Sequence, residues 1–199
     1  MPITVAHVRW RILARAVLTL CFAGGLFPTL SQLSPMVRAA PSPEYLIKAA
    51  YLYNFALFVE WPAEVFATRD APIVIGIIGA DPFDQALERT IQDKRINGRT
   101  LVVRRLQPGQ DVRQAHILFV RSSEAARNDE LIGRLAGHPV LLVGETPDFS
   151  RRGGTITFTI EDERVRFEIN VEAVRRARLN VSATLLNVAR VVRSNPRTS

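Results

Sequence analysis

The residue types that most often carry catalysis are scarce in this sequence. Beyond residue 39 the chain contains two histidines, His116 and His138, and no cysteine, because its single cysteine is Cys21. No His-x-x-x-His pair is available to begin a zinc site, and no Gly-x-Ser-x-Gly turn presents a serine nucleophile. We therefore predict a protein that is not an enzyme, with no catalytic residue, no metal and no cofactor. We interpret both histidines as structural residues at strand edges.

Glycines beside basic residues are the next feature that could bind a ligand. Two arginines precede two glycines in the run from Arg151 to Gly154, and guanidinium groups on a flexible turn can hold a carboxylate or a phosphate. The alternative is an exposed basic turn before a strand, and both interpretations stay open. The run from Gly76 to Gly79 lies at the end of a predicted strand and before a predicted helix, but its spacing does not match a dinucleotide-binding loop, so we interpret it as a tight strand-to-helix turn.

The strongest signal is a concentration of aromatic residues. Beyond residue 39 the chain has three Tyr, one Trp and eight Phe, and seven of these twelve lie between Tyr45 and Phe66. The segment either fills the core with large side chains or presents a binding face, since Tyr and Trp are enriched where an apolar body meets a polar rim. The candidate residues for binding a partner or ligand are Lys48, Tyr51, Asn54, Phe55, Trp61, Arg151, Arg152 and Arg166.

Helical spacing divides this aromatic segment into two faces. One stripe is expected to pack on a sheet, and it consists of Leu46, Ala50, Tyr53 and Leu57. The opposite side is an apolar surface interrupted by one cation, which suits a partner or a pocket. It consists of Lys48, Tyr51, Leu52 and Phe55.

The elements that must position these residues follow from hydrophobic periodicity. The segment 44–59 is apolar almost all the way round, which predicts a helix covered on two sides and ended by Pro62. A continuous apolar run predicts a strand buried on both faces at 73–78. Further strands are predicted at 100–106, 117–120 and 140–143. Two helices are predicted between these strands. One begins at Asp81-Pro82 and continues through Phe83, Leu87 and Ile91, and the other runs from Ser123 to about Leu135.

The pattern changes after residue 150. Residues 155–160 and 165–170 alternate apolar and polar side chains around an acidic turn at Asp162, which predicts an antiparallel hairpin. Asn170 and Ser182 are predicted helix N-caps. The second of these helices has an apolar stripe of Leu185, Val188, Ala189 and Val192. The predicted fold class is α/β: a mixed sheet of parallel strands crossed by helices plus a C-terminal antiparallel hairpin, with helices on both faces.

The first 39 residues have the pattern of a signal peptide. Arg9, Arg11 and Arg15 precede an apolar stretch at 16–27, and Ala39 ends a small-residue cleavage site. A membrane anchor is the alternative, but glycines and a proline interrupt the apolar stretch before it reaches about 20 residues. We therefore expect export to the periplasm and cleavage near Ala39. The expected organisation is a signal peptide at 1–39, a Pro-rich lead-in at 40–43, one domain at 44–193 and a polar tail at 194–199.

The net charge gives no reason to expect nucleic acid as a partner. The formal charge is +7, but four of the 26 cations lie in the first 39 residues, which contain no Asp or Glu. The remaining 22 cations face 19 carboxylates, which leaves about +3.

Three segments of the sequence resemble the YfiR family of periplasmic regulators. They are the opening run KAAYLYNFALFVEWP at 48–62, the central AHILFV at 115–120 and the closing segment at 153–190. Together they cover about residues 44–192. Well-studied members carry cysteine pairs, whereas this chain has no cysteine beyond residue 39, so redox sensing by disulfide exchange does not carry over.

The resemblance implies a role that composition does not reveal. It implies a periplasmic protein that represses a membrane-bound diguanylate cyclase, and hence cyclic di-GMP signalling and biofilm formation, by binding the periplasmic sensor domain of that enzyme. It also implies an outer-membrane lipoprotein with a peptidoglycan-binding domain that sequesters the repressor. A homodimer stays open, and the alternative function is a small-molecule sensor that acts on another membrane receptor.

Overall fold

The computed structural model describes residues 41–107 and 109–194, and helices alternate with strands along most of this length. The strands are β1 (Val59–Glu60), β2 (Ile73–Ile78), β3 (Arg95–Ile96), β4 (Arg99–Leu106), β5 (Ile117–Val120), β6 (Leu141–Gly144), β7 (Ile156–Glu161), β8 (Arg164–Asn170), β9 (Asn180–Val181) and β10 (Arg190–Val192). The α-helices are α1 (Pro43–Phe58), α2 (Ala86–Ile91), α3 (Asn128–Arg134), α4 (Val171–Arg176) and α5 (Ala183–Val188). Short 3₁₀ helices are η1 (Ala63–Val65), η2 (Val112–Gln114) and η3 (Ser122–Arg127).

An eight-stranded mixed sheet has the order β10-β8-β7-β6-β5-β2-β4-β3. The strands from β4 through β2, β5 and β6 to β7 are parallel neighbours. The chain then reverses, since β8 is antiparallel to β7, and β10 is parallel to β8. A separate two-stranded pair joins β1 to β9. This is the predicted mixed α/β sheet with a C-terminal hairpin.

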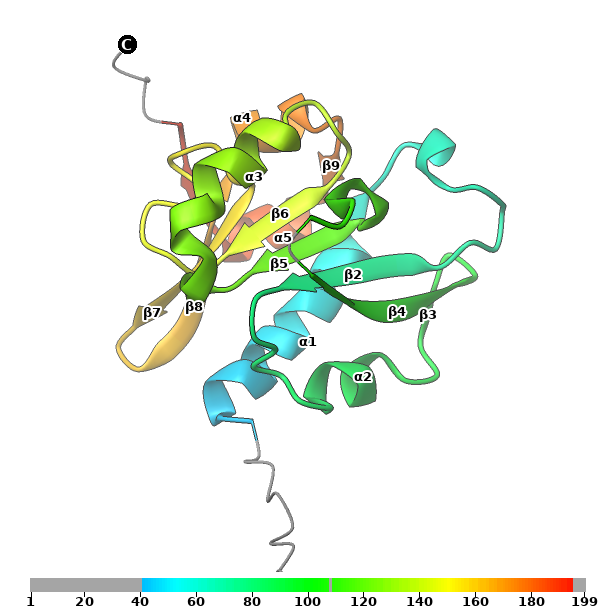
Figure 1. The fold of residues 1–199 in the computed structure, drawn as a ribbon, viewed down its shortest axis with the longest axis horizontal. Coiled ribbons are helices and arrows are strands. Elements are labelled where there is room, and N and C mark those ends of the chain that lie inside the picture. The colour runs from blue at the N-terminus through cyan, green and yellow to red at the C-terminus, as the bar shows by residue number, and fades with distance from the viewer. Residues whose placement is uncertain (1–40, 108, 195–199) are drawn as a thin grey trace, which may run out of the picture. The chain divides into compact units, whose positions relative to one another are not determined.

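Helices cover both faces of the sheet, so the buried strands are apolar on both sides. In Figure 1, α1 and α5 pass behind the sheet and α3 lies in front of it. The rear core contains Leu52 and Phe55 of α1 against Phe119 of β5 and Phe158 of β7. The front core contains alternate residues of β5 and β6 against α3. The helices on both faces are therefore confirmed.

Several local predictions hold because their signals are local. Asp162 and Glu163 form the two-residue hairpin turn with φ of 48° and 59°, the conformation that matches the twist of the flanking strands. The Asn170 side chain accepts a hydrogen bond from the Ala173 backbone N–H at 3.0 Å and caps α4. The Ser182 hydroxyl accepts one from the Leu185 N–H at 3.3 Å and caps α5.

Three predicted helices differ from the structure. The helix expected from Asp81 begins only at Ala86, because Asp84 has a φ of 53° and interrupts helical geometry. The helix expected from Ser123 is 3₁₀ in its first half and becomes α3 at Asn128. The last helix ends at Val188, and Val192 lies instead on β10, which adds a strand to the edge of β8.

The order of the strands creates a switch point between β2 and β5. From β2 the chain crosses by way of α2 to β4 on one side, and from β5 it crosses by way of α3 to β6 on the other. The loops at the carboxyl ends of β2 and β5 therefore diverge, which is where open α/β sheets form a crevice for a ligand.

Candidate functional site

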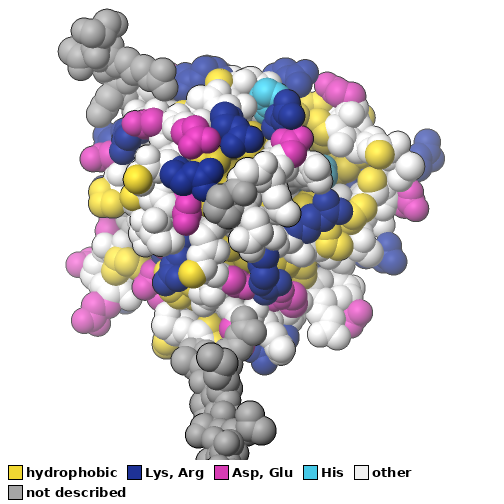
Figure 2. Space-filling model, in the orientation of Figure 1, with side chains coloured by type: hydrophobic (Ala, Val, Ile, Leu, Met, Phe, Trp, Pro, Cys, Tyr) yellow, Lys and Arg dark blue, Asp and Glu magenta, His cyan; other side chains and the backbone are white. Residues whose placement is uncertain are grey.

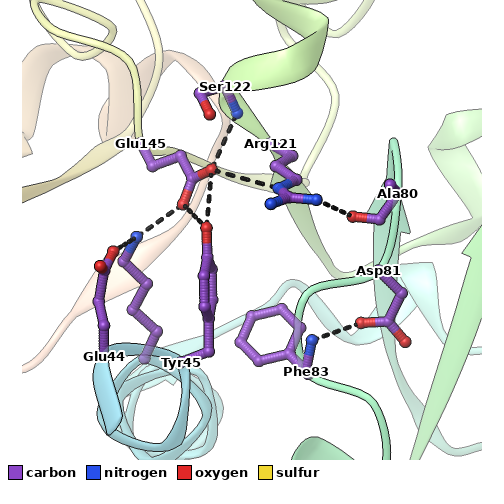
Figure 3. A network of polar contacts seen from close by, with 9 residues as sticks. Glu44, Tyr45, Ala80, Asp81, Phe83, Arg121, Ser122 and Glu145 are labelled. Carbon is purple, nitrogen blue, oxygen red and sulfur yellow. Dashed lines mark hydrogen bonds and ion pairs between the residues drawn. The ribbon is translucent and has the colours of Figure 1, made fainter. Parts of the chain in front are cut away.

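Three loops meet at the carboxyl ends of the parallel strands and contact the first two turns of α1. Ala80 follows β2, Arg121 and Ser122 follow β5, and Glu145 follows β6 (Figure 3). The parallel register of β2, β5 and β6 brings these positions to one edge of the sheet. The site is thus assembled from segments that are far apart in the sequence.

Glu145 is the centre of this cluster, with a side chain only 5% exposed. Its carboxylate accepts hydrogen bonds from Lys48 Nζ at 2.6 Å and from the Ser122 backbone N–H at 2.9 Å. The Tyr45 hydroxyl donates to the same carboxylate, at 3.2 and 3.3 Å from its two oxygens. Arg121 Nε lies 4.0 Å away. Burial raises the pKa of Glu145, but the hydrogen bonds and charge of Lys48 and the Ser122 N–H outweigh burial, so the net pKa is lowered.

Lys48 is buried as deeply as its partner, with a side chain 4% exposed. Besides Glu145 it pairs with Glu44 at 2.5 Å, and its ammonium lies 4.6 Å from the centre of the Tyr45 ring. Burial lowers the pKa of Lys48, but hydrogen bonds to Glu145 and Glu44 exceed that effect and raise it. Lys48 and Glu145 are therefore both ionised at neutral pH and form a buried ion pair.

The cluster extends along the switch point. Arg121 donates to the Ala80 carbonyl at 3.2 Å, and Asp81 accepts from the Phe83 N–H at 2.8 Å (Figure 3). The Tyr45 ring meets the Phe83 ring edge-on, with centroids 5.6 Å apart. These contacts fix the start of α1 against the loops that follow β2, β5 and β6.

A hollow of about 350 Å³ lies beside the ion pair. It is lined by Glu44, Tyr45, Lys48, Ser122, Glu145, Pro147, Phe158, Thr159 and Ile160. The Thr159 hydroxyl is buried and has no hydrogen-bond partner among the described residues. The lining can hold a small molecule that offers an apolar surface to Phe158 and Ile160.

The polar groups of the cluster position α1 against the ends of the strands. Glu145 has two direct side-chain donors and one backbone donor, so little of its acceptor capacity is left for use as a base. Within residues 41–107 and 109–194 no group of three or more His, Cys, Asp or Glu side chains is arranged to hold a metal ion.

The predicted division of α1 into faces is wrong, because it is reversed. The side expected to bind a partner is the buried one: Lys48 is 3% exposed, and Leu52 and Phe55 are fully buried. The stripe expected in the core is the outer one, with Leu46 49% and Leu57 46% exposed. The sequence assigned Lys48 to a face for a partner or a pocket, but Glu145, a residue 97 positions away, pairs with it inside the protein.

The other aromatic candidates also lie in packed positions. The Tyr51 and Phe55 rings pack against Phe158 and Phe167 with centroids 5.1 to 6.0 Å apart, and Asn54 is half-buried. Trp61 donates from its ring nitrogen to the His116 carbonyl at 3.1 Å, so it fastens the segment after β1 to the start of β5. A direct partner contact through Phe55 would require the core to open.

The three candidate arginines lie apart from the α1 residues and do not gather into one site. Arg152 pairs with Asp129 of α3. Arg151 lies 3.5 Å from Glu168 and 3.4 Å from Asp148. Arg166 is exposed on β8 between Val165 and Phe167, both of which face α1, so it projects from the opposite side of the sheet.

His116 holds two parts of the chain together at the other end of the sheet. Its Nδ1 accepts a hydrogen bond from the Val74 N–H at 3.1 Å, and the Phe66 ring stacks on it with centroids 4.6 Å apart. Burial, together with the charges of Arg99 and Arg104, lowers its pKa to about 4. Its neutral ring is a structural element, as its place at a strand edge suggested.

Sequence reasoning missed the residue on which the site is built. Glu145 was not singled out, nor were Tyr45, Arg121 and Ser122. A usable signal was present, since polar residues directly follow the buried runs 117–120 and 141–144, and the carboxyl ends of parallel strands share one edge.

The fold and the site together define a class: a mixed α/β domain with a buried ion pair at the carboxyl ends of its parallel strands. The chain matches the family described as YfiR/HmsC-like over residues 45–190, which runs from α1 to the first residue of β10. The chain therefore belongs to the YfiR/HmsC-like family, as its three segments suggested. Members of this family are periplasmic proteins that regulate diguanylate cyclases and are not themselves enzymes.

The signal peptide predicted at 1–39 lies outside the described residues, as does most of the polar tail. Along the part of the chain that the structure describes, none of the helices combines the length and the apolar character needed to span a bilayer.

Proposed function

We propose that this protein is a periplasmic repressor that binds the periplasmic sensor domain of an inner-membrane diguanylate cyclase and holds the enzyme inactive. The observation that carries the proposal is the family match, which spans almost the whole described domain. The paired state of Glu145 and Lys48 agrees with it, because the conspicuous buried charges are engaged in holding the fold and not in a reaction. On this proposal the protein is not an enzyme and acts through contact.

Repression of this kind is a coupling free energy between the outer and inner parts of the cyclase. Shifting the cyclase from 99% active to 99% inactive requires about 5.5 kcal/mol of differential affinity for its two states. A protein interface with a few buried anchors provides free energy on this scale. The repressor needs no catalytic group for this purpose.

The test is genetic and measures whether cyclic di-GMP rises or falls when the gene is deleted. Deleting the gene should raise cellular cyclic di-GMP and biofilm mass, because the cyclase is released from inhibition. Complementation with the full-length gene should restore the low level. Complementation with a version that lacks residues 1–39 should not, because the protein would stay in the cytoplasm. Unchanged or lower cyclic di-GMP in the deletion strain would contradict the proposal.

The upstream partner is proposed on the same basis. We propose that an outer-membrane lipoprotein with a peptidoglycan-binding domain sequesters the repressor and so activates the cyclase. Overproducing that lipoprotein should raise cyclic di-GMP only in cells that contain the repressor.

One observation favours a second candidate function, that of a small-molecule sensor. The hollow beside Lys48 has a buried Thr159 hydroxyl with no partner among the described residues. A ligand at 100 times its dissociation constant would stabilise the fold by about 2.7 kcal/mol. A thermal-shift screen of periplasmic metabolites, with Thr159→Val as the matched control, would detect such a ligand.

A further inference from the structure

The outer side of α1 is apolar and carries no exposed charge. Between Glu44 and Glu60 the only charged residue is Lys48, and it is buried. The exposed positions along this helix are Leu46 at 49%, Ile47 at 46% and Leu57 at 46%, with Ala50 between them. These residues lie on one side of the helix, with Leu46 and Ile47 on its first turn, Leu57 on its last turn, and Ala50 and the half-buried Tyr53 and Asn54 between them. Such a group differs from the single exposed residues normal for a soluble surface.

Helix α5 lies against α1 and also carries an exposed apolar residue. The Ser182 N–H at the start of α5 donates to the Phe58 carbonyl at the end of α1, at 3.0 Å. The six residues of α5 include no charged residue, and Val188 is 65% exposed. Val191 on the adjoining β10 is 55% exposed. We call Leu46, Ile47, Ala50, Leu57, Val188 and Val191 the α1–α5 surface.

Polar contacts surround this surface. At the far end of α1, Asn180 donates to Glu60 at 3.0 Å, and Arg178 pairs with Glu64 at 3.5 Å. At the near end lies the pair of Glu44 with Lys48. On the side of α2 the Lys94 ammonium lies 4.1 Å from the centre of the Tyr53 ring. An uncharged apolar centre inside a polar rim is the composition of a protein interface.

The opposite side of the domain differs in character. On the face that carries α3, positively charged side chains are interspersed with Asp and Glu (Figure 2). Several of these charges are paired, as in Arg127 with Glu124 and Arg152 with Asp129. A solvated surface of this kind needs no partner, so the two sides of the sheet are chemically distinct.

We infer that the α1–α5 surface is where the repressor docks on its partner, and that it receives an uncharged apolar face of the cyclase's periplasmic domain. This inference rests on the proposed function and names the surface that performs it. A lipid surface fits poorly, because membrane-bound helices place Lys or Arg beside their apolar residues and the exposed part of this surface has none.

The area of the α1–α5 surface also favours a reversible contact with a regulatory partner over a permanent homodimer. A 16-residue helix is about 24 Å long and a six-residue helix about 9 Å, and with a width of about 10 Å they offer roughly 300 to 400 Å². A standard interface covers about 800 Å² on each partner, and obligate homodimers cover more. The α1–α5 surface therefore suits the apolar centre of a reversible contact, with the polar rim supplying the remainder.

The test combines binding with stability. Leu46→Glu and Leu57→Lys together place charges on the surface with the signs that the helix dipole favours at each end, so α1 should remain folded. Ala126→Lys is the matched control, an exposed position on η3 on the other side of the sheet. Binding is measured against the purified periplasmic domain of each membrane diguanylate cyclase encoded in the genome. The double variant should melt within about 3 °C of wild type, bind at least tenfold more weakly and fail to repress, whereas Ala126→Lys should bind normally.

Each contrary result has a distinct meaning. If wild type binds a cyclase domain and the double variant binds it equally well, the docking surface is elsewhere and only this inference fails. If wild type binds no cyclase domain at all, the proposed function fails and the inference fails with it. Sedimentation velocity tests whether the surface instead binds a second copy of the chain. If the wild type is a dimer and the double variant is a monomer, the inference is overturned.

Discussion

Lys48→Met is the perturbation that most directly tests the buried cluster. Methionine has a similar length and no charge, so it leaves Glu145, 5% exposed, without the ammonium that lies 2.6 Å away. Removing one partner of a buried ion pair costs about 3–5 kcal/mol, because the other charge stays buried. The Tyr45 hydroxyl and the Ser122 N–H still donate to Glu145, so we expect a loss near the lower limit, about 3 kcal/mol. In a domain of this size that corresponds to a fall of about 6–12 °C in Tm.

The assay is urea unfolding at pH 7 followed by circular dichroism, with Tm measured in parallel. The control is Lys94→Met, which removes the other lysine of the chain from an exposed position beside Tyr53 and should cost less than about 1 kcal/mol. In Lys48→Met with Glu145→Gln no buried charge is left unpaired. The double variant should therefore be more stable than the sum of the two single losses predicts, by about 2 kcal/mol.

The dependence of stability on pH gives a second readout of the same pair. The folded protein lowers the pKa of Glu145 below its ordinary value of 4.5, so its contribution to stability is full above that value and is lost as the pH falls through the folded pKa. In Lys48→Met the pKa of Glu145 should rise toward or above its ordinary value, because burial then acts without the opposing ammonium, so the loss of stability below pH 4.5 that Glu145 causes in the wild type should shrink or disappear. If Lys48→Met proves as stable as Lys94→Met, Lys48 is not buried with Glu145, and the description of the inner face of α1 is wrong.

Two further predictions concern the other end of the sheet and the N-terminus. The pKa of His116 falls from 6.5 to about 4 on folding, so the unfolded chain binds the proton first and stability should decline as the pH drops from about 6.5 toward 4. Allowing for solvent screening at this half-buried position, the decline should be about 1–2 kcal/mol and should be absent in His116→Gln, as pH-dependent urea unfolding would show. Protein isolated from the periplasm should begin near Ala40 by N-terminal sequencing, and a full-length N-terminus retained in the membrane would contradict cleavage.

Helix α1 shows that hydrophobic periodicity can predict the bounds of a helix without predicting which side is buried. The helix was predictable from its apolar run and from Pro62, and its bounds at 43–58 lie within one residue of the expected 44–59. Its orientation was not predictable, because nearly every position of the helix is apolar and no stripe stands out. Helical spacing alone therefore chose the wrong stripe for the core, and Lys48 gave no warning because its partner, Glu145, lies far away in the sequence.

The sequence alone determined the features that depend on neighbouring residues. These include the alternation of helices and strands, the hairpin with its turn at Asp162, the caps at Asn170 and Ser182, and the family itself. Each is encoded within a few positions or in contiguous motifs, so no tertiary information is needed to find it.

Only the tertiary structure decided which residues form the site and which form the surface. The Glu145 cluster joins α1 to loops that follow three strands, and parallel pairing brings those loops to one edge of the sheet. Whether Lys48 or Leu57 faces water depends on what covers each side of α1, and that is set by the order of the strands. Burial depends on how the layers pack and not on the helix alone. The sequence of α1 is compatible with packing either side on the sheet, and only the assembled fold decides between them.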